Sequence, residues 1–284
     1  MPELVRSAAR RLLLLALTVA GAAVLATALV RLAPGFGMDE RQLDLRFNER
    51  SRDAARAEGA ASGAGRYLIG LLHGDWGSSI SLRQPVRDLV AQRAGVTART
   101  LAAGLSMAWG AASLLCFAAL WVPWRGLDFL LTLLTGGLLC LPAAVVAILA
   151  MYFEAGPALA LALVLFPRVM RYARDILVAG TRQPHVMAAR SRGIGPAAIV
   201  LRHVCLPATP QLLALAGISV GLAAGAVVPV EALCDSAGIG QLVWQSALAR
   251  DLPLLVPLTM LAAAITCAAN LCADAGRALA CRWM

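Results

Sequence analysis

The side chains best suited to polar chemistry gather in one segment, 180–209, which lies between two apolar stretches. It contains His185, Arg190 and Arg192, followed by Arg202 and His203. Arginine donates charge-assisted hydrogen bonds to carboxylates, which suits contact with another protein. Neighbouring helices need a connection of only about 2 to 8 residues. A polar segment of this length therefore predicts a contact surface as well as a connection.

The types and spacing of the other reactive residues argue against catalysis and metal binding. The three histidines (His73, His185 and His203) are too scattered for a zinc site, and the seven cysteines form no C-x-x-C pair. The sequence has no lysine, which a Walker A loop needs on the nucleotide phosphates. We expect no catalytic residue, metal or cofactor here, and any ATP hydrolysis must occur in a separate subunit.

Two short helices are expected to position the polar segment. The first is predicted over 184–192, ending at Gly193 and at Gly195-Pro196. The second is predicted over 197–204 and closed by Leu206-Pro207. The small side chains of Ala188 and Ala189 would let a partner approach the first helix closely.

The whole chain has the composition of an integral membrane protein. Of its 284 residues 60% are hydrophobic and 14% charged, with a mean hydropathy of +0.75. Apolar runs predict an all-α, polytopic fold with about six membrane helices, at 12–30, 98–121, 138–154, 157–178, 210–231 and 253–275. The net charge of +9 is explained by arginines in loops at a membrane surface, so no nucleic-acid partner is expected.

The distribution of arginine predicts the topology. Thirteen arginines fall in the N-terminal tail, 122–137, 168–209 and the C-terminal tail, whereas the opposite short loops hold only Arg250. Both termini and the polar segment are therefore expected in the cytoplasm. The predicted division is a tail and first helix (1–30), an extracytoplasmic segment (31–97), and a core (98–284) with five membrane helices and the loop 180–209.

Arg168, Arg171 and Arg174 recur every three residues at the cytoplasmic end of the fourth predicted helix. Such spacing favours one side of a helix. Two interpretations stay open: contact with a cytoplasmic partner, or arginines that reach toward anionic lipid headgroups.

The polar segment resembles a known motif. The run from His185 to Ile194, with Arg202-His203 and Leu206-Pro207, is similar to the cytoplasmic coupling loop of ABC importer permeases, in the A-R-x-R/K-G-L form of the peptide/nickel family. This resemblance implies contact with an ATPase subunit through a set of loop residues. They are His185, Met187, Ala188, Ala189, Arg190, Arg192, Gly193, Ile194, Arg202, His203, Leu206 and Pro207.

Three further stretches resemble the same family. They are 73–79 with Pro85-Val86, the run 225–253, and Asn270-Leu271 with Asp274. Within the second run, the candidate pathway or gate residues are Glu231, Gly238, Gly240, Arg250 and Asp251. Glu231 is expected either to line the pathway or to cap the segment that follows it.

The resemblance implies a type I ABC importer permease in a bacterial inner membrane. Its expected partners are a second, homologous permease, two cytoplasmic ABC ATPases, an extracytoplasmic solute-binding protein and the lipid bilayer. The solutes of such systems include di- and oligopeptides and nickel. The alternatives are a secondary transporter or channel, for which the spans hold few ionisable residues, and a membrane scaffold that does not transport.

Overall fold

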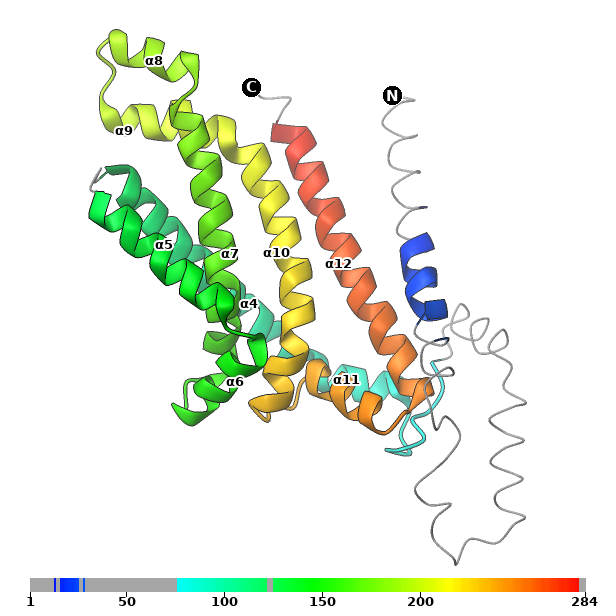
Figure 1. The fold of residues 1–284 in the computed structure, drawn as a ribbon. Coiled ribbons are helices and arrows are strands. Elements are labelled where there is room, and N and C mark those ends of the chain that lie inside the picture. Colours follow the sequence, from blue (N-terminus) through cyan, green and yellow to red (C-terminus); the bar gives the residue numbers. More distant parts are fainter. Residues whose placement is uncertain (1–12, 14–15, 26–27, 29–75, 122–124, 281–284) are drawn as a thin grey trace, which may run out of the picture. The chain divides into compact units, whose positions relative to one another are not determined.

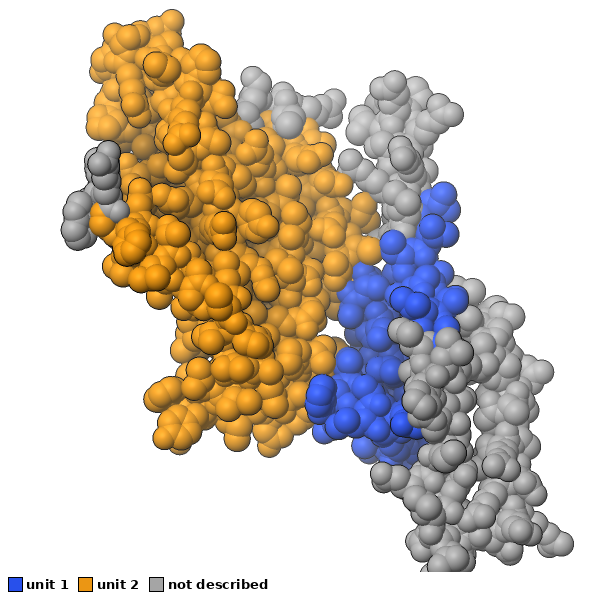
Figure 2. All heavy atoms as spheres, in the orientation of Figure 1, with its two compact units in different colours: residues 1–93, 242–264 blue, residues 94–241, 265–284 orange. Residues whose placement is uncertain are grey.

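The structure of this chain is a computed structural model that describes residues 13, 16–25, 28, 76–121 and 125–280. These residues form helices, and the one strand-like pairing among them is an isolated bridge between Ser78 and Pro85. The chain divides into two compact units, 1–93 with 242–264 and 94–241 with 265–284 (Figure 2). Each unit is described below by itself.

Within the described residues from Val86 onward, ten helical elements follow one another (Figure 1). They are α4 (Val86–Trp121), α5 (Arg125–Cys140), α6 (Ala143–Tyr152), α7 (Gly156–Thr181), α8 (Pro184–Ser191), α9 (Pro196–Ala198), the π-helix η2 (Ile199–Cys205), α10 (Leu206–Leu233), α11 (Ile239–Leu248) and α12 (Leu252–Ala280).

The helices confirm an all-α fold suited to crossing a membrane. Within the described residues, four helices are long and apolar enough to span a bilayer, and the bent pair α5–α6 raises the number to five. The predicted first span contributes a shorter apolar helix, Ala16–Leu25, and residues on both sides of it lie outside the described part of the chain. The predicted number of about six is thus approximate. Residues 29–75, most of the predicted outer segment, are also outside it.

The predicted third span, 138–154, is wrong in its boundaries. This part of the chain instead forms two helical segments, Asp128–Cys140 and Ala143–Tyr152, whose directions differ by 97°. The bend lies at Pro142, which takes an extended conformation (φ −59°, ψ 145°) and precedes α6. A proline has no N–H to continue the preceding helix, so a new helix starts after it. Gly136 and Gly137 lie inside α5 and do not end it.

α4 begins at Val86, well before the predicted start of the second span at residue 98. Pro85 precedes it, and its carbonyl accepts a hydrogen bond from the Leu89 N–H at 3.3 Å. Asp88 places a negative charge in the first turn, near the positive end of the helix dipole, and this stabilises the start of α4. Residues 86–97 of the predicted outer segment are therefore helical.

In the unit formed by 94–241 and 265–284, α7 lies at the centre and packs against α5, α6 and α10. Its Leu161, Leu165 and Met170 are fully buried. A side chain at Gly104 of α4 would overlap Leu161, so these two helices are in close contact. Phe129 on α5 is 71% exposed, which suits a lipid-facing surface.

Gly217 and Gly221 of α10 allow α12 to pack closely against it within the same unit. A Cβ at Gly217 would lie 2.7 Å from the Ala273 Cβ, and one at Gly221 would lie 3.0 Å from the Thr266 Cγ2. Gly225 has no neighbouring atom within 4 Å. Close helix packing through the first two glycines thus takes place within the chain.

Candidate functional site

The predicted coupling loop folds as a short helix that projects beyond α7 (Figure 1). Gln183 is extended (φ −71°, ψ 144°) and Pro184 opens α8, because its fixed φ suits the first helical turn. Val186 and Ala189, three residues apart, are buried and hold α8 to the rest of its unit. The sequence suggested that Ala189 would let a partner approach α8 closely, but Ala189 is 3% exposed and faces the rest of its own unit. This arrangement leaves the opposite side of α8 free.

The exposed side of α8 combines positively charged side chains with apolar ones. Met187 is 66% exposed, and the side chains of His185, Ala188, Arg190 and Arg192 are exposed as well. Methionine adapts its shape to a partner, and arginine can pair with a carboxylate. This surface has the chemistry of a protein contact.

Gly193 ends α8 in a left-handed conformation, with φ +74°. The Ile194 N–H donates to the Ala189 carbonyl at 3.3 Å, and the Gly193 N–H donates to the Arg190 carbonyl at 3.0 Å. This is the Schellman arrangement of a helix end. The half-buried Ile194 packs against the core beside it. Gly193 therefore sets the direction in which the chain leaves α8.

Gly193→Ala should loosen this loop, because an L-residue in the left-handed region costs about 1 kcal/mol. About fivefold faster tryptic cleavage at the exposed Arg190 and Arg192 is expected, since 1 kcal/mol changes an opening equilibrium by that factor. Gly195→Ala is the control, because Gly195 has φ −63° and no neighbour within 4 Å. Equal cleavage rates in the two variants would contradict this role for Gly193.

The predicted end of the second loop helix at Leu206-Pro207 is wrong. The helix continues through η2 into α10, and the Leu206 N–H donates to the Leu201 carbonyl. A π-helical turn inserts one extra residue, which changes the hydrogen-bond pattern where Pro207 enters. Pro207 has no N–H to give the His203 carbonyl four residues before it. That carbonyl instead lies 2.9 Å from the His185 Nε2.

The bond between His185 and the His203 backbone ties α8 to η2. A carbonyl only accepts, so the His185 Nε2 must carry the hydrogen. Val204 of η2 is buried, and its Cγ1 would lie 3.1 Å from a Cβ at Gly180 of α7. Arg202, Leu206 and Pro207 are exposed. The α8 and η2 segments thus form one packed assembly at the end of α7.

Glu231 is the centre of the second predicted site. It lies near the end of α10 and is fully buried. Its Oε2 accepts hydrogen bonds from the Thr97 Oγ1 at 3.0 Å and from the Gly240 N–H at 2.7 Å. The Thr97 Oγ1 also accepts from the Ile239 N–H at 2.7 Å. Glu231 therefore caps the start of α11 and joins it to α4 and α10.

Gly238 and Gly240 make room for this carboxylate. A Cβ at Gly238 would overlap the Glu231 side chain, and one at Gly240 would lie 2.7 Å from the Val227 carbonyl oxygen. Three of the five candidate gate residues thus meet at one contact. Thr97 was not identified from the sequence, because a single threonine between Arg93 and Arg99 carries no motif.

Asp251 belongs to the other unit and is 1% exposed. Its Oδ2 accepts from the Ser79 Oγ at 2.6 Å, the Ser81 Oγ at 2.7 Å and the Ser81 N–H at 3.0 Å. Its Oδ1 lies 3.3 Å from the Leu254 N–H in the first turn of α12. Arg250 beside it is exposed and left-handed, with φ +51°. Asp251 thus caps α12 and holds the 78–85 turn.

Within the described residues, no cluster of three or more His, Cys, Asp or Glu side chains could hold a metal ion. The buried carboxylates are instead engaged with hydroxyl and backbone donors. The fold and sites define a polytopic helical membrane protein with a projecting loop helix.

Comparison with known proteins assigns the family. Residues 116–283 match the model of the binding-protein-dependent transport system inner membrane component. Since this match covers more than half of the chain, the chain belongs to that family of membrane transport permeases.

Several relatives share part of the sequence. The oligopeptide transport system permease protein OppB of Escherichia coli is 29% identical over 227 residues, covering 70% of this chain and 72% of that protein. The oligopeptide transport system permease protein AppB of Bacillus subtilis is 27% identical over 118 residues. A protein of Brucella ovis named as a peptide permease is 28% identical over 118 residues. These shorter matches cover 42% of this chain but only 37% of each relative's length.

Proposed function

We propose that this chain is the transmembrane permease subunit of an ATP-driven importer for peptides, and that α8 receives the movement of an ATPase subunit. The observation that carries the proposal is the form of the 180–209 loop. α8 is fixed on one side by buried Val186 and Ala189, and exposes Met187 and Arg190 on the other. Because one side of α8 is packed against the rest of its unit, a displacement of α8 by a bound ATPase would also displace the helices against which it packs.

Peptides are favoured as substrates because the relatives described above are named as peptide or oligopeptide permeases. In this proposal a second, homologous permease completes the pathway, two ATPases bind from the cytoplasm, and a solute-binding protein delivers the peptide from outside. The 180–209 loop and both termini face the cytoplasm, in keeping with their arginine content. ATP hydrolysis belongs to the ATPases.

The gate residues have a structural task in this mechanism. Glu231, Gly238 and Gly240 join α10 to α11, so movement of α10 at its cytoplasmic end would reach α11 through this contact. Asp251 and Arg250 precede α12 and set its beginning.

The test is to co-express the chain with its candidate permease and ATPases and measure ATPase recovery by affinity purification. Arg190→Glu with Gly193→Pro should reduce recovery at least about tenfold, since a lost ionic contact and a broken helix end each cost more than 1 kcal/mol. Arg277→Glu, an exposed arginine in the last turn of α12, is the charge-matched control and should bind normally.

Two results would count against this function. One is that the wild-type chain recovers no ATPase although it is inserted and folded, and the other is that the Arg277→Glu control loses binding as fully as the double variant. In the first case a secondary transporter or a scaffold would replace the importer.

A further inference from the structure

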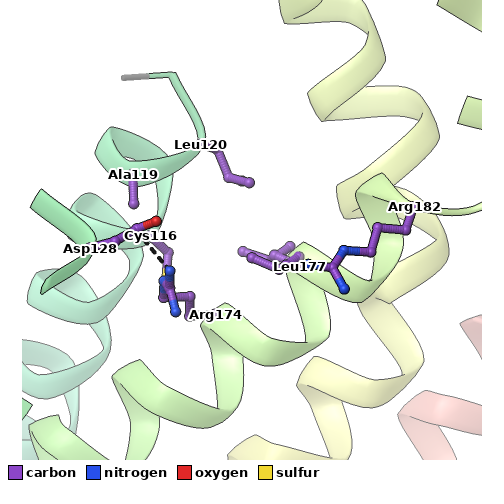
Figure 3. Close-up of a pocket in the computed structure, with 8 residues that line it drawn as sticks. Cys116, Ala119, Leu120, Asp128, Arg174, Leu177 and Arg182 are labelled. Carbon is purple, nitrogen blue, oxygen red and sulfur yellow. Dashed lines mark hydrogen bonds and ion pairs between the residues drawn. The ribbon is translucent and has the colours of Figure 1, made fainter. Parts of the chain in front are cut away.

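A small cavity lies among the ends of three helices in the unit that carries α8 (Figure 3). Its volume is about 180 Å³. The lining residues are Cys116, Ala119 and Leu120 of α4, Asp128 of α5, Arg174, Leu177 and Val178 of α7, and Arg182 at the end of α7. Apolar side chains thus form one part of the wall and charged groups another.

The charges in the wall do not balance. Arg174 donates from Nη2 to the Asp128 Oδ1 at 2.7 Å, which neutralises one positive charge. Arg182 lines the same cavity, and no carboxylate is paired with it among the described residues. The cavity therefore has two guanidinium groups for one carboxylate. This excess suits a singly charged anion.

Arg174 has a further donor to offer. Its Nε is buried and has no hydrogen-bond partner, although the side chain as a whole is 29% exposed. A buried, unpaired N–H of a charged group is costly, so a turn of the Arg174 side chain that brings Nε to an oxygen ligand in the cavity would remove that cost. Guanidinium groups bind phosphate oxygens well because their donors form a planar fork.

The cavity lies where a membrane surface is expected. α4 ends at Trp121, α5 begins at Arg125, and α7 ends at Thr181 just before α8. Arg174 precedes the end of α7 by about 10 Å along the helix, at 1.5 Å per residue. Trp121 and Tyr172 are exposed at this end, as aromatic residues of the headgroup region commonly are.

We propose that this cavity binds the phosphate group of an anionic ligand, with Arg174 and Arg182 as donors and a lipid headgroup as its source. Leu177 and Val178 would lie against the glycerol and the first methylenes of the acyl chains. Basic pockets between membrane helices on the cytoplasmic side recognise anionic headgroups through the same chemistry. The inference concerns the bundle itself and stands apart from ATPase coupling through α8.

The test measures lipid retained by the purified full-length chain, using native mass spectrometry and titration with dioleoyl phosphatidylglycerol or dioleoyl phosphatidylcholine. Phosphatidylglycerol should bind about tenfold more tightly, because phosphatidylcholine carries the same phosphate but brings a choline cation close to the two guanidinium groups. Arg182→Gln should remove most of this preference, and it should not unfold the chain because Arg182 is exposed. Arg174→Lys should weaken binding less than Arg174→Gln, since lysine keeps the charge.

The matched control is Arg171→Gln, an exposed arginine of α7 that does not line the cavity. It should keep the preference within about twofold. Glycerol 1-phosphate carries the phosphate without the acyl chains. Competition at the same concentration as the lipid would assign the site to a soluble phosphate ester and overturn the lipid source, whereas competition only at much higher concentrations assigns it to lipid. Equal retention of both lipids by the wild type, or an equal loss in Arg171→Gln and Arg182→Gln, would overturn the proposal.

Discussion

Gly240→Ala should lower the free energy of unfolding by about 2 to 3 kcal/mol, the cost of a methyl group forced into a closely packed site. The new Cβ would lie 2.7 Å from the Val227 carbonyl oxygen and 2.9 Å from the Glu231 Oε2. The carbonyl belongs to the backbone of α10 and cannot turn away. Thermal unfolding of the purified chain, monitored by size-exclusion chromatography after heating, should show a midpoint several degrees lower.

Gly225→Ala provides the control for this prediction. Gly225 lies inside α10 with no neighbour within 4 Å, so alanine there should be neutral or slightly stabilising. Adding Glu231→Ala to Gly240→Ala removes one of the close atoms, the Glu231 Oε2, and the two changes should therefore not be additive. An unchanged midpoint for Gly240→Ala would show that the contact between α10 and α11 is looser than described.

Asp251→Ala should cause a comparable loss, about 3 kcal/mol, because it leaves the buried Ser79 hydroxyl without its acceptor and removes the carboxylate that caps α12 and holds Ser81. The carboxylate accepts from the Ser79 and Ser81 hydroxyls, from the Ser81 N–H and from the Leu254 N–H. The midpoint of thermal unfolding measures this effect. Ser81→Ala removes only one of these donors and should cost about 1 kcal/mol.

Asp235→Ala is the matched control for Asp251→Ala. Asp235 is exposed, and its Oδ1 accepts from the Gln241 Nε2 at 2.8 Å. Its loss should cost no more than about 1 kcal/mol, part of which arises because Asp235 is left-handed (φ +48°), a conformation that alanine tolerates less well than aspartate. If the Asp235 and Asp251 variants unfold at the same temperature, Asp251 does not hold the 78–85 turn.

Much of the helical pattern followed from sequence, because apolar runs and breakers act locally. The predicted start of the fourth span at Pro157 is one residue from the observed start of α7 at Gly156. Pro142 and Pro207 were harder to interpret. The first bends a tract by 97°, and the second lies inside a continuous helix behind a π-turn. A proline's effect depends on the hydrogen bonds that its neighbours find, and the sequence does not show these.

The site residues likewise include some whose structure follows from the local sequence and others whose partners do not. The ends of α8 follow from Pro184 and Gly193, which act within one turn. The partners of the acidic residues do not follow, because Thr97 is 134 positions from Glu231 and Ser79 is 172 positions from Asp251. The sequence motifs contain both members of the second pair, yet only the folded chain shows that they are bonded. The side of α8 that Ala189 faces was likewise set by packing.

The unbroken helix from η2 into α10 has a mechanical consequence. Pro196–Leu233 contains 38 residues, which at 1.5 Å each is roughly 55 Å. The His185 Nε2 is bonded to this helix at the His203 carbonyl, near one end, and Glu231 lies near the other. The helix bends between them, where it contains the π-turn and the internal prolines Pro210 and Pro229 (Figure 1). A push or twist applied beside α8 therefore reaches the first turn of α11 only to the extent that these bends keep their angle.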